Sequence, residues 1–450
     1  MPYIPTTPAE EQQMLATLGI KSIDDLFRDV PKSLRYPDIK LEAGKSEMEV
    51  LQEISAMAGR NANADTYKWF LGAGAYNHYV PSIIGAIASR GEFLTAYTPY
   101  QPEVAQGTLQ AIFEYQSLVT SLTGMDVSNA GHYDGATALA EAAIMALKNG
   151  EGQGKKKVLI PATLHPEYIE VLKTYLAPRG AIIETYNSSP SGGGRVGVPQ
   201  DLACLIAAYP DFLGEIPDDL EGLADAVHAA GALFIVHADP IMLGIFKSPG
   251  EYGADIVTAE GQSLGNDLNF GGPYLGVMAV KEALMRKMPG RIVGEAHDDQ
   301  GRRGFVLTLA AREQHIRREK AVSNICSNEG LAMLRAAIYL SLMGTEGLKG
   351  VAELCWNNSH YLASIIEEKA HAKTQSRKGV FFKEFVVELP CDAELVYKKM
   401  FDKGIVAGLP LGRYYPDKKN EMLVCVTEKN TKAQMDEYAA LLKAVLEEAK

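Results

Sequence analysis

Lys157-Val158-Leu159-Ile160, the helical stretch His165–Tyr175 and Ala181-Ile182-Ile183-Glu184 decide the fold class. The same alternation of apolar run and helix continues along the chain, in the segments Leu202–Ala207, Asp218–Ala230, Ala232–Val236 and Asp255–Thr258. Strands that are apolar along their whole length are buried on both faces, which is typical of a parallel sheet covered by helices. The sequence therefore predicts an α/β fold with a mostly parallel sheet flanked by helices.

The segments on either side of this region have different patterns. Pro8-Ala9-Glu10-Glu11 opens a helix, and Ser22-Ile23-Asp24-Asp25 has the spacing of a capping box. A long helical pattern from Glu329 is broken by Gly344, and apolar runs then alternate with helices to the end of the chain. We expect an N-terminal helical arm (1–70), a large α/β domain (71–330) and a small C-terminal α+β domain (331–450), with a glycine- and serine-rich loop at 188–197.

Composition excludes several classes of protein. The chain of 450 residues has 44 basic and 56 acidic side chains and a net charge of −12, which disfavours nucleic-acid binding. Its five cysteines form no C-x-x-C pair, so we expect neither a metal site nor a disulfide framework, and a reducing cytoplasm. No uncharged apolar run approaches the roughly 20 residues of a membrane span, and no signal peptide is recognised.

Asp134-Gly135-Ala136-Thr137 opens an alanine-rich helix and is the first candidate for a binding site. Free N–H groups and the helix dipole at such a turn favour a phosphate group. The alternative is an ordinary helix whose N-terminus is capped by Asp134, and the negative charge of Asp134 would also oppose a phosphate.

Several longer strings make the family recognisable. They are Phe70–His78, Tyr97–Glu103, Asp134–Glu141, Gly261–Asn266, Phe270–Tyr274, Arg312–Lys320, Ser323–Cys326 and Leu411–Pro416. Over essentially its whole length the chain resembles the fold-type-I (aminotransferase-like) pyridoxal-phosphate enzymes. Within them it resembles the alpha subunit of glycine dehydrogenase (decarboxylating), the N-terminal-type subunit of the P-protein of the glycine cleavage system.

The resemblance implies a role for each residue of a remnant cofactor pocket. Gly135 and Thr137 match positions that cradle the cofactor phosphate, and His165 matches a side chain that stacks on the pyridine ring. Asp239 matches the carboxylate that pairs with the pyridinium nitrogen. The alternative for His165 and Asp239 is that they are satisfied polar residues lining a core.

Ser263 stands where the resemblance places the lysine that holds the cofactor as an imine. A serine hydroxyl cannot form an imine. The lysines nearest in sequence are Lys247 and Lys281, and neither suits a short reach from the end of the strand. We therefore expect no cofactor bound covalently to this chain.

The resemblance implies decarboxylation of glycine and transfer of the aminomethyl group to the lipoyl arm of the H-protein. Pyridoxal phosphate would then be carried by a beta subunit, in an α2β2 heterotetramer whose active site this chain completes. The first alternative is a non-catalytic scaffold that docks the beta chain and the H-protein. The second is a self-sufficient pyridoxal enzyme that uses an unexpected lysine.

Some residues are candidates for completing the partner's site. In Tyr97-Thr98-Pro99-Tyr100-Gln101-Pro102-Glu103, two prolines stiffen a segment whose tyrosines and glutamine can orient a small amino acid. The alternative is a rigid inter-domain turn whose tyrosines pack in the core. The other candidates are His78, which could titrate near neutral pH or be structural, and the arginines Arg312 and Arg317. The arginines could meet the partner subunit, an acidic carrier protein or the substrate carboxylate, or could lie on a solvated helix face with Glu313 and Glu319 as local partners.

Overall fold

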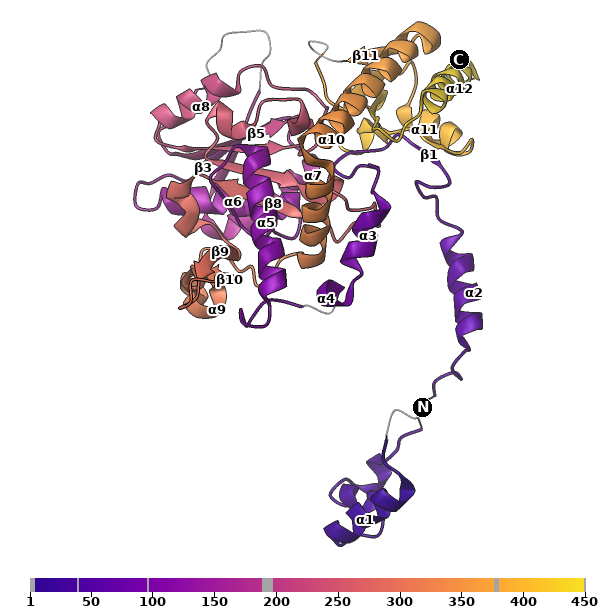
Figure 1. Ribbon diagram of the computed structural model, residues 1–450. Helices are drawn as coiled ribbons and strands as arrows, with labels where there is room; N and C mark the ends of the chain where they lie inside the picture. Colours follow the sequence, from indigo (N-terminus) through magenta and orange to yellow (C-terminus); the bar gives the residue numbers. More distant parts are fainter. Residues whose placement is uncertain (1–4, 39, 95–96, 188–196, 376–379, 449–450) are drawn as a thin grey trace. The chain divides into compact units, whose positions relative to one another are not determined.

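The computed structural model describes residues 5–38, 40–94, 97–187, 197–375 and 380–448, so nearly all of the predicted loop 188–197 lies outside the described residues. The chain divides into two compact units, Met1–Ala62 and Asn63–Lys450 (Figure 1). Within the described residues, no helix combines the length and apolarity needed to cross a membrane.

The first unit is helical. It contains α1 (Pro8–Leu18), the short 3-10 helices Ile23–Phe27 and Lys32–Leu34, and α2 (Glu47–Ala58). The predicted helix at Pro8 and the predicted capping box at Ser22–Asp25 are confirmed, and Ser46 and Glu49 form a further capping box at α2. Among the described residues of this unit, Leu15 alone is buried, so its helices leave most of their apolar side chains exposed.

A seven-stranded sheet forms the centre of the second unit. Its order is β2-β8-β7-β6-β5-β3-β4. The strands are β2 (Val127–Ser128), β3 (Lys157–Pro161), β4 (Ile182–Tyr186), β5 (Leu202–Tyr209), β6 (Leu233–Ala238), β7 (Ile256–Glu260) and β8 (Gly276–Val280). The five strands from β7 to β4 are parallel, and β8 is antiparallel to both of its neighbours. The predicted mostly parallel sheet is confirmed.

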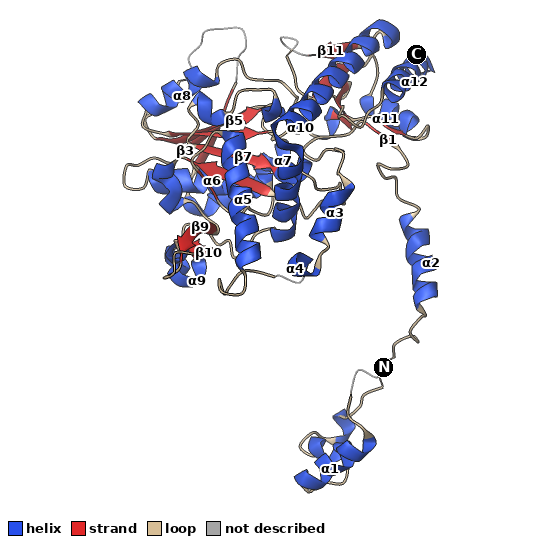
Figure 2. Cartoon of the chain, viewed as in Figure 1, coloured by secondary structure: helices blue, strands red, loops and turns tan. Residues whose placement is uncertain are grey.

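Helices cover both faces of this sheet (Figure 2). Successive side chains of a strand point to opposite faces. Accordingly, Cys204 and Ile206 pack with α6 (Gly135–Asn149) and α7 (Pro166–Leu176). Leu205 and Ala207 pack with α5 (Gln106–Thr123), α8 (Leu220–Ala229) and the first part of α10 (Gly330–Ile365). This double burial explains why β5 is apolar almost along its whole length and why the polar residues of the other central strands lie mainly at the strand ends.

The C-terminal part has its own core and an antiparallel sheet of order β11-β12-β15-β14. Its strands are β11 (Lys373–Gln375), β12 (Glu384–Glu388), β14 (Leu409–Pro410) and β15 (Glu421–Cys425), and its helices are α11 (Ala393–Phe401) and α12 (Lys432–Glu448). Gly344 is non-helical inside α10, with φ of 57°, so the predicted break is confirmed. β1 (Lys68–Trp69) pairs with β13 (Ile405–Val406), which ties residues 68–69 to this part.

The remaining elements lie between these regions in sequence. They are α3 (Ser82–Ala88), α4 (Gly91–Leu94), α9 (Gln314–Arg317) and an antiparallel hairpin of β9 (Ile292–His297) and β10 (Arg303–Thr308). The sequence analysis does not predict this hairpin.

Candidate functional site

A small cavity lies at the carboxyl ends of the parallel strands, where open α/β sheets bind their ligands. Its volume is about 60 Å³, which is room for a few water molecules. Most lining residues lie at the ends of β3, β5, β6 and β7 or in the segments that follow these strands, and Gly74, Tyr76 and Glu384 come from other parts of the chain. The lining residues are Gly74, Tyr76, Leu164, His165, Tyr168, Ala208, Pro210, Asp211, Phe212, His237, Ala238, Asp239, Pro240, Glu260 and Glu384. The predicted pocket residues His165 and Asp239 therefore meet at one place.

Asp239, just after β6, is already paired. Its Oδ2 lies 2.5 Å from Nζ of Lys383, and its Oδ1 accepts hydrogen bonds from the N–H groups of Ile241 and Met242. Burial opposes the charge on both partners, but the ion pair outweighs it, so the pKa of Asp239 is lowered and the pKa of Lys383 is raised. Both side chains are therefore held in their charged forms.

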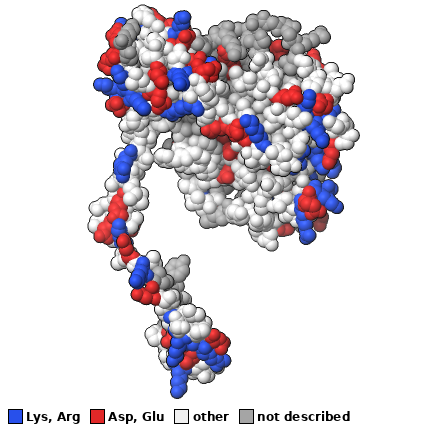
Figure 3. Space-filling model, turned by 180° about the vertical axis from the view of Figure 1, so that it is seen from behind, with Lys and Arg blue, Asp and Glu red and all other residues white. Residues whose placement is uncertain are grey.

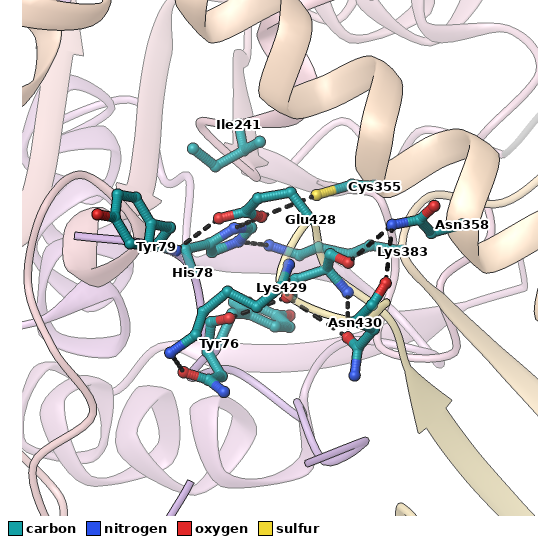
Figure 4. A network of polar contacts seen from close by, with 12 residues as sticks. Tyr76, His78, Tyr79, Ile241, Cys355, Asn358, Lys383, Glu428, Lys429 and Asn430 are labelled. Carbon is teal, nitrogen blue, oxygen red and sulfur yellow. Dashed lines mark hydrogen bonds and ion pairs between the residues drawn. The ribbon is translucent and has the colours of Figure 1, made fainter. Parts of the chain in front are cut away.

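Lys383 reaches this position from the C-terminal part of the chain. It is fully buried, with 0% exposure, and its Nζ lies 3.4 Å from the centre of the Tyr76 ring and 3.2 Å from Nε2 of His78. Figure 4 shows the lysine pointing toward His78 within a network of polar contacts. A lysine held protonated in this way is a poor nucleophile, because imine formation needs the neutral amine.

His78 belongs to the same network. Its Nδ1 lies 2.7 Å from Oε2 of Glu428, and the thiol of Cys355 donates to the same oxygen at 3.5 Å. The candidate metal-ligand atoms of these three residues lie within 4.8 Å of one another. Glu428 already accepts from both His78 and Cys355, and the three residues come from distant segments of the chain. We therefore assign the cluster to hydrogen bonding that holds these segments together within the second unit.

The side chain of Glu260, at the end of β7, occupies the N-terminus of α6. Its Oε2 accepts from the N–H of Gly135 at 2.8 Å, and its Oε1 accepts from the N–H groups of Gln262 and Leu275 at 2.8 and 3.1 Å. Burial raises the pKa of Glu260 to about 8, although these three donors oppose the rise. The N–H group of Gly135, which could otherwise donate to a phosphate, is therefore already hydrogen-bonded to Glu260.

Asp134 and Thr137 complete the cap of α6. The Asp134 side chain accepts from the N–H of Thr137 at 2.7 Å, and the Thr137 hydroxyl bonds back to the N–H of Asp134 at 3.1 Å. This is the ordinary capped helix that the sequence analysis kept as its alternative.

His165 is the N-cap of α7, and its ring stacks on Tyr168 with centroids 4.8 Å apart and 21° between the planes. Its Nε2 lies 3.0 Å from the carbonyl oxygen of Ala73. Burial lowers the pKa of His165. One face of the ring predicted to stack on a cofactor is therefore covered by a ring of this chain.

Ser263 is buried at the end of a 3-10 helix directly after β7, at the carboxyl edge of the sheet. The two lysines considered from the sequence pair elsewhere, Lys281 with Asp255 at 2.8 Å and Lys247 with Glu221. Neither lines the cavity.

Comparison with known proteins gives the family. A sequence model of the glycine cleavage system P-protein matches residues 1–442 of the chain. The chain belongs to this family. A P-protein relative from Desulforamulus reducens, named probable glycine dehydrogenase (decarboxylating) subunit 1, is 49% identical over 450 residues, which are 99% of this chain and 100% of that protein.

Solved structures agree with the P-protein assignment. A crystal structure of the glycine decarboxylase (P-protein) of the glycine cleavage system, in inhibitor-bound form, has a TM-score of 0.88 and 43% identity, covering 99% of this chain and 100% of that one. A sphingosine-1-phosphate lyase from Burkholderia pseudomallei, with a TM-score of 0.66 and 14% identity, covers 93% of this chain and 94% of its own and shares the fold. The predicted resemblance and the fold-type-I class are confirmed.

The pocket of this P-protein chain does not fit pyridoxal phosphate, the cofactor of its fold type. A fit would need a lysine at the end of β7, a free helix N-terminus for the phosphate and a free carboxylate for the ring nitrogen. Here Ser263, whose hydroxyl cannot form an imine, lies just after β7, Glu260 accepts a hydrogen bond from the N–H of Gly135 at the start of α6, and Lys383 is paired with Asp239. No reaction step is therefore assigned to a cofactor in this pocket.

The segment Tyr97–Gln101 of the P-protein chain lies at the surface and away from the cavity. Tyr97 and Tyr100 are 80% and 70% exposed, and their rings lie 6.4 Å apart. The guanidinium group of Arg291 donates to the Thr98 hydroxyl and lies 5.9 Å from the Tyr100 ring centre. The tyrosines therefore do not pack in a core, which was the alternative considered for them.

The two candidate arginines have different surroundings. Arg312 is half-buried, and its guanidinium group donates to the carbonyl oxygens of Leu309, Met288 and Gly290. Arg317, the last residue of α9, is exposed. The contacts of Arg312 give it a structural role in holding the loop before β9, whereas Arg317 can meet another molecule.

The sequence analysis missed the residues that close the pocket. Glu260 had a usable signal, because it lies two residues beyond the predicted strand Asp255–Thr258, at an end of the sheet that was predicted to bear the site. Lys383 and Glu384 interrupt the apolar string Phe381-Phe382-Lys383-Glu384-Phe385, which is a weaker signal. Glu384 accepts from the N–H of Ala73 at 2.6 Å and from the Tyr76 hydroxyl at 2.8 Å, and burial raises its pKa to about 7.

Proposed function

We propose that this chain is the alpha subunit of a two-subunit glycine dehydrogenase (decarboxylating), active with a beta subunit that holds pyridoxal phosphate. The observation that carries the proposal is full-length similarity to proteins named as subunit 1 of that enzyme, in a chain whose own pocket is closed. When bound to the beta subunit, the cofactor supplies the electron sink for decarboxylation. This chain contributes surface residues that complete the site.

An apolar surface supports the contact with the beta subunit. Among the described residues between 79 and 104, six large apolar side chains are exposed: Tyr79, Ile83, Leu94, Tyr97, Tyr100 and Val104. Figure 3 shows a broad area of the second unit where Lys, Arg, Asp and Glu are sparse. Exposed aromatic side chains and a depletion of charge are typical of the centre of a protein interface. We assign residues 79–104 to the interface with the beta subunit, in an α2β2 assembly.

Within that surface, Tyr97, Thr98, Tyr100 and Gln101 are the residues proposed to reach the partner's site. Arg291 fixes the segment through Thr98, and the exposed hydroxyl and amide groups can donate hydrogen bonds to a small amino acid. The earlier candidates His78 and Arg312 are not part of this proposal, because each is committed to internal partners. Arg317 remains a candidate contact for the beta subunit.

The product of decarboxylation is proposed to pass to the lipoyl arm of the H-protein, in the cytoplasm. All five cysteines are free thiols, and three of them are buried, as suits a reducing compartment. The alternative function is a scaffold that stabilises the beta subunit and docks the H-protein without touching glycine.

Reconstitution tests the proposal. The purified chain, the beta subunit and lipoylated H-protein are mixed, and exchange of glycine with labelled bicarbonate is measured. We expect exchange only when both subunits are present. The variant Gln101→Ala should lower exchange at least about tenfold in an intact complex, the loss expected when an orienting contact is removed from a transition state. The matched control, Gln153→Ala in an exposed loop, should leave exchange unchanged.

The outcomes separate the two functions. Exchange by the beta subunit alone at the full rate would refute a catalytic role. Wild-type exchange by both Gln101→Ala and Tyr100→Ala, with the complex intact by size-exclusion chromatography, would establish the scaffold instead.

A further inference from the structure

Three side chains of this chain contact the three groups that the family resemblance assigns to holding a phosphorylated pyridine ring. The groups are the N-terminus of α6, the face of His165 and the carboxylate of Asp239. The three occupants come from different elements: Glu260 ends β7, Tyr168 lies in α7 and Lys383 precedes β12. All three side chains lie in or beside one cavity, and the loss of a lysine after β7 does not by itself explain this arrangement.

Glu260 supplies an acidic group where a phosphate would bind. All three of its hydrogen-bond partners are backbone N–H groups, those of Gly135, Gln262 and Leu275. A cup of convergent N–H groups at a helix N-terminus is the usual arrangement for an anion. The carboxyl group therefore satisfies donors that would otherwise be buried without a partner.

Tyr168 supplies a flat ring where the pyridine ring would stack. Its ring lies nearly parallel to that of His165, 4.8 Å away, and edge-on to His237 at 5.1 Å. A Cβ atom built on Gly135 would lie 2.9 Å from the Tyr168 hydroxyl and 2.9 Å from Cβ of Glu260. The tyrosine and the glutamate thus fill the same end of the pocket, beside the start of α6.

Lys383 supplies a cationic N–H group to Asp239, as a protonated ring nitrogen would. The pair is 2.5 Å long and both side chains are almost completely buried. Lys383 has a left-handed backbone with φ of 47°, which is unfavourable for a residue with a side chain. Such a conformation persists only where surrounding contacts hold it in place.

We propose that Glu260, Tyr168 and Lys383 together form a built-in substitute for pyridoxal phosphate, so that the pocket is kept folded without the cofactor and is closed to it. The missing lysine is then one of several barriers. This inference concerns the isolated chain, so its failure would leave the proposed subunit function untouched.

The first experiment restores the lysine while the three occupants stay. The full-length chain with Ser263→Lys is incubated with pyridoxal phosphate, reduced with borohydride and analysed by mass spectrometry after digestion. We expect no pyridoxyl group on Lys at position 263, as in the wild-type chain. Capture of the cofactor there would overturn the proposal, because the absent amine would then be the sole barrier.

The second experiment empties the phosphate position. In Glu260→Ala, inorganic phosphate should raise the melting temperature by about 2 °C or more in a saturable way, since it can refill the N–H cup. Chloride at the same ionic strength should not raise the melting temperature of Glu260→Ala. Neither phosphate nor chloride should produce this saturable rise in the wild type. A folded Glu260→Ala variant without a phosphate-specific shift would overturn the proposal. If one variant does not fold, the other experiment decides alone.

Discussion

Lys383, just before β12, and Asp239, just after β6, form a buried ion pair. Removing one partner of such a pair leaves an uncompensated buried charge and strongly lowers the free energy of unfolding, whereas replacing both partners by uncharged residues has a much smaller effect. Figure 4 shows that Lys383 also approaches His78, so its loss would affect a wider network. The stability of the chain should therefore depend strongly on keeping both charges or neither.

Replacing Lys383 by methionine should destabilise the chain by about 3–5 kcal/mol, because Asp239 stays buried without its cation. Urea unfolding followed by circular dichroism measures the loss. The control is the double variant Lys383→Met and Asp239→Asn, which removes both charges and should recover most of the stability. The single variant Asp239→Asn completes the comparison. If the loss of stability in the double variant equals the sum of the losses in the two single variants, the two charges do not interact and the ion pair does not stabilise the chain.

Glu428 gives a prediction for acid pH. Burial alone would raise its pKa, but the charge and hydrogen bond of His78 and the N–H of Tyr79 outweigh burial and lower the pKa of Glu428 to about 2. A lowered pKa means that folding favours the carboxylate. Its stabilisation is thus present above its ordinary pKa of 4.5 and is lost as the pH falls toward about 2.

The wild type should therefore lose stability relative to Glu428→Gln as the pH falls from about 5 to about 2, by about 3 kcal/mol. The difference between the stability–pH curves of the wild type and Glu428→Gln reports on Glu428 alone. Glu260 and Glu384, whose pKa values are raised to about 8 and about 7, change the stability in the opposite direction with pH but contribute equally to both curves. Parallel curves for wild type and variant would contradict the assigned pairing with His78.

At the scale of elements, the break in α10 is the feature most open to test. Gly344 has φ of 57° and ψ of −168° inside the helix, a conformation available in practice to glycine. A Cβ atom at Gly344 or at Gly350 would meet nothing within 4 Å. Both positions therefore have room for a side chain, and they differ only in backbone conformation.

Gly344→Ala should therefore destabilise the chain by about 1–3 kcal/mol through backbone strain. Gly350→Ala in the same helix should stabilise it by about 0.5–1 kcal/mol, because alanine favours a regular helix over glycine. Thermal unfolding of both variants measures the difference. Equal shifts would mean that α10 has no break at Gly344.

Elements differ in how far the sequence could predict them. β3, β5 and β6 were predictable because burial on both faces removes polar residues from a strand, and the break at Gly344 because glycine interrupts a regular apolar pattern. The β9–β10 hairpin was missed because its strands are half-exposed and carry charges such as Glu295 and Arg303.

The candidate site was predictable only in part. Asp239 and His165 follow strands, so topology brings them to one edge of the sheet. Lys383 lies far from Asp239 in the sequence, just before β12, and its contact with Asp239 depends on how the C-terminal part packs against the sheet. No local pattern in the sequence specifies such a contact, and for this reason the lysines Lys247 and Lys281 were considered in place of Lys383.

At the scale of the whole molecule, the exposed apolar face of α2 should contact the beta subunit. Leu51 and Ile54 are 65% and 57% exposed, and helices of this composition are stable mainly when their apolar face is covered. Leu51→Asp should weaken binding of the beta subunit at least about tenfold without changing the melting temperature of the isolated chain.

The matched control is Gln52→Asp, which adds the same charge one residue away on the other side of α2. Binding is measured by isothermal titration calorimetry with the purified beta subunit. Equal affinities for Leu51→Asp and Gln52→Asp would exclude α2 from the interface.

The most direct test of the central claim is to count pyridoxyl groups in the reconstituted complex. The complex is saturated with pyridoxal phosphate and glycine exchange is verified, and borohydride reduction is followed by separation of the two subunits and peptide mapping. We expect one pyridoxyl-lysine on each beta subunit and none on this chain, Lys383 included. A pyridoxyl group on Lys383, or on any other lysine of this chain in amounts that follow activity, would contradict this expectation.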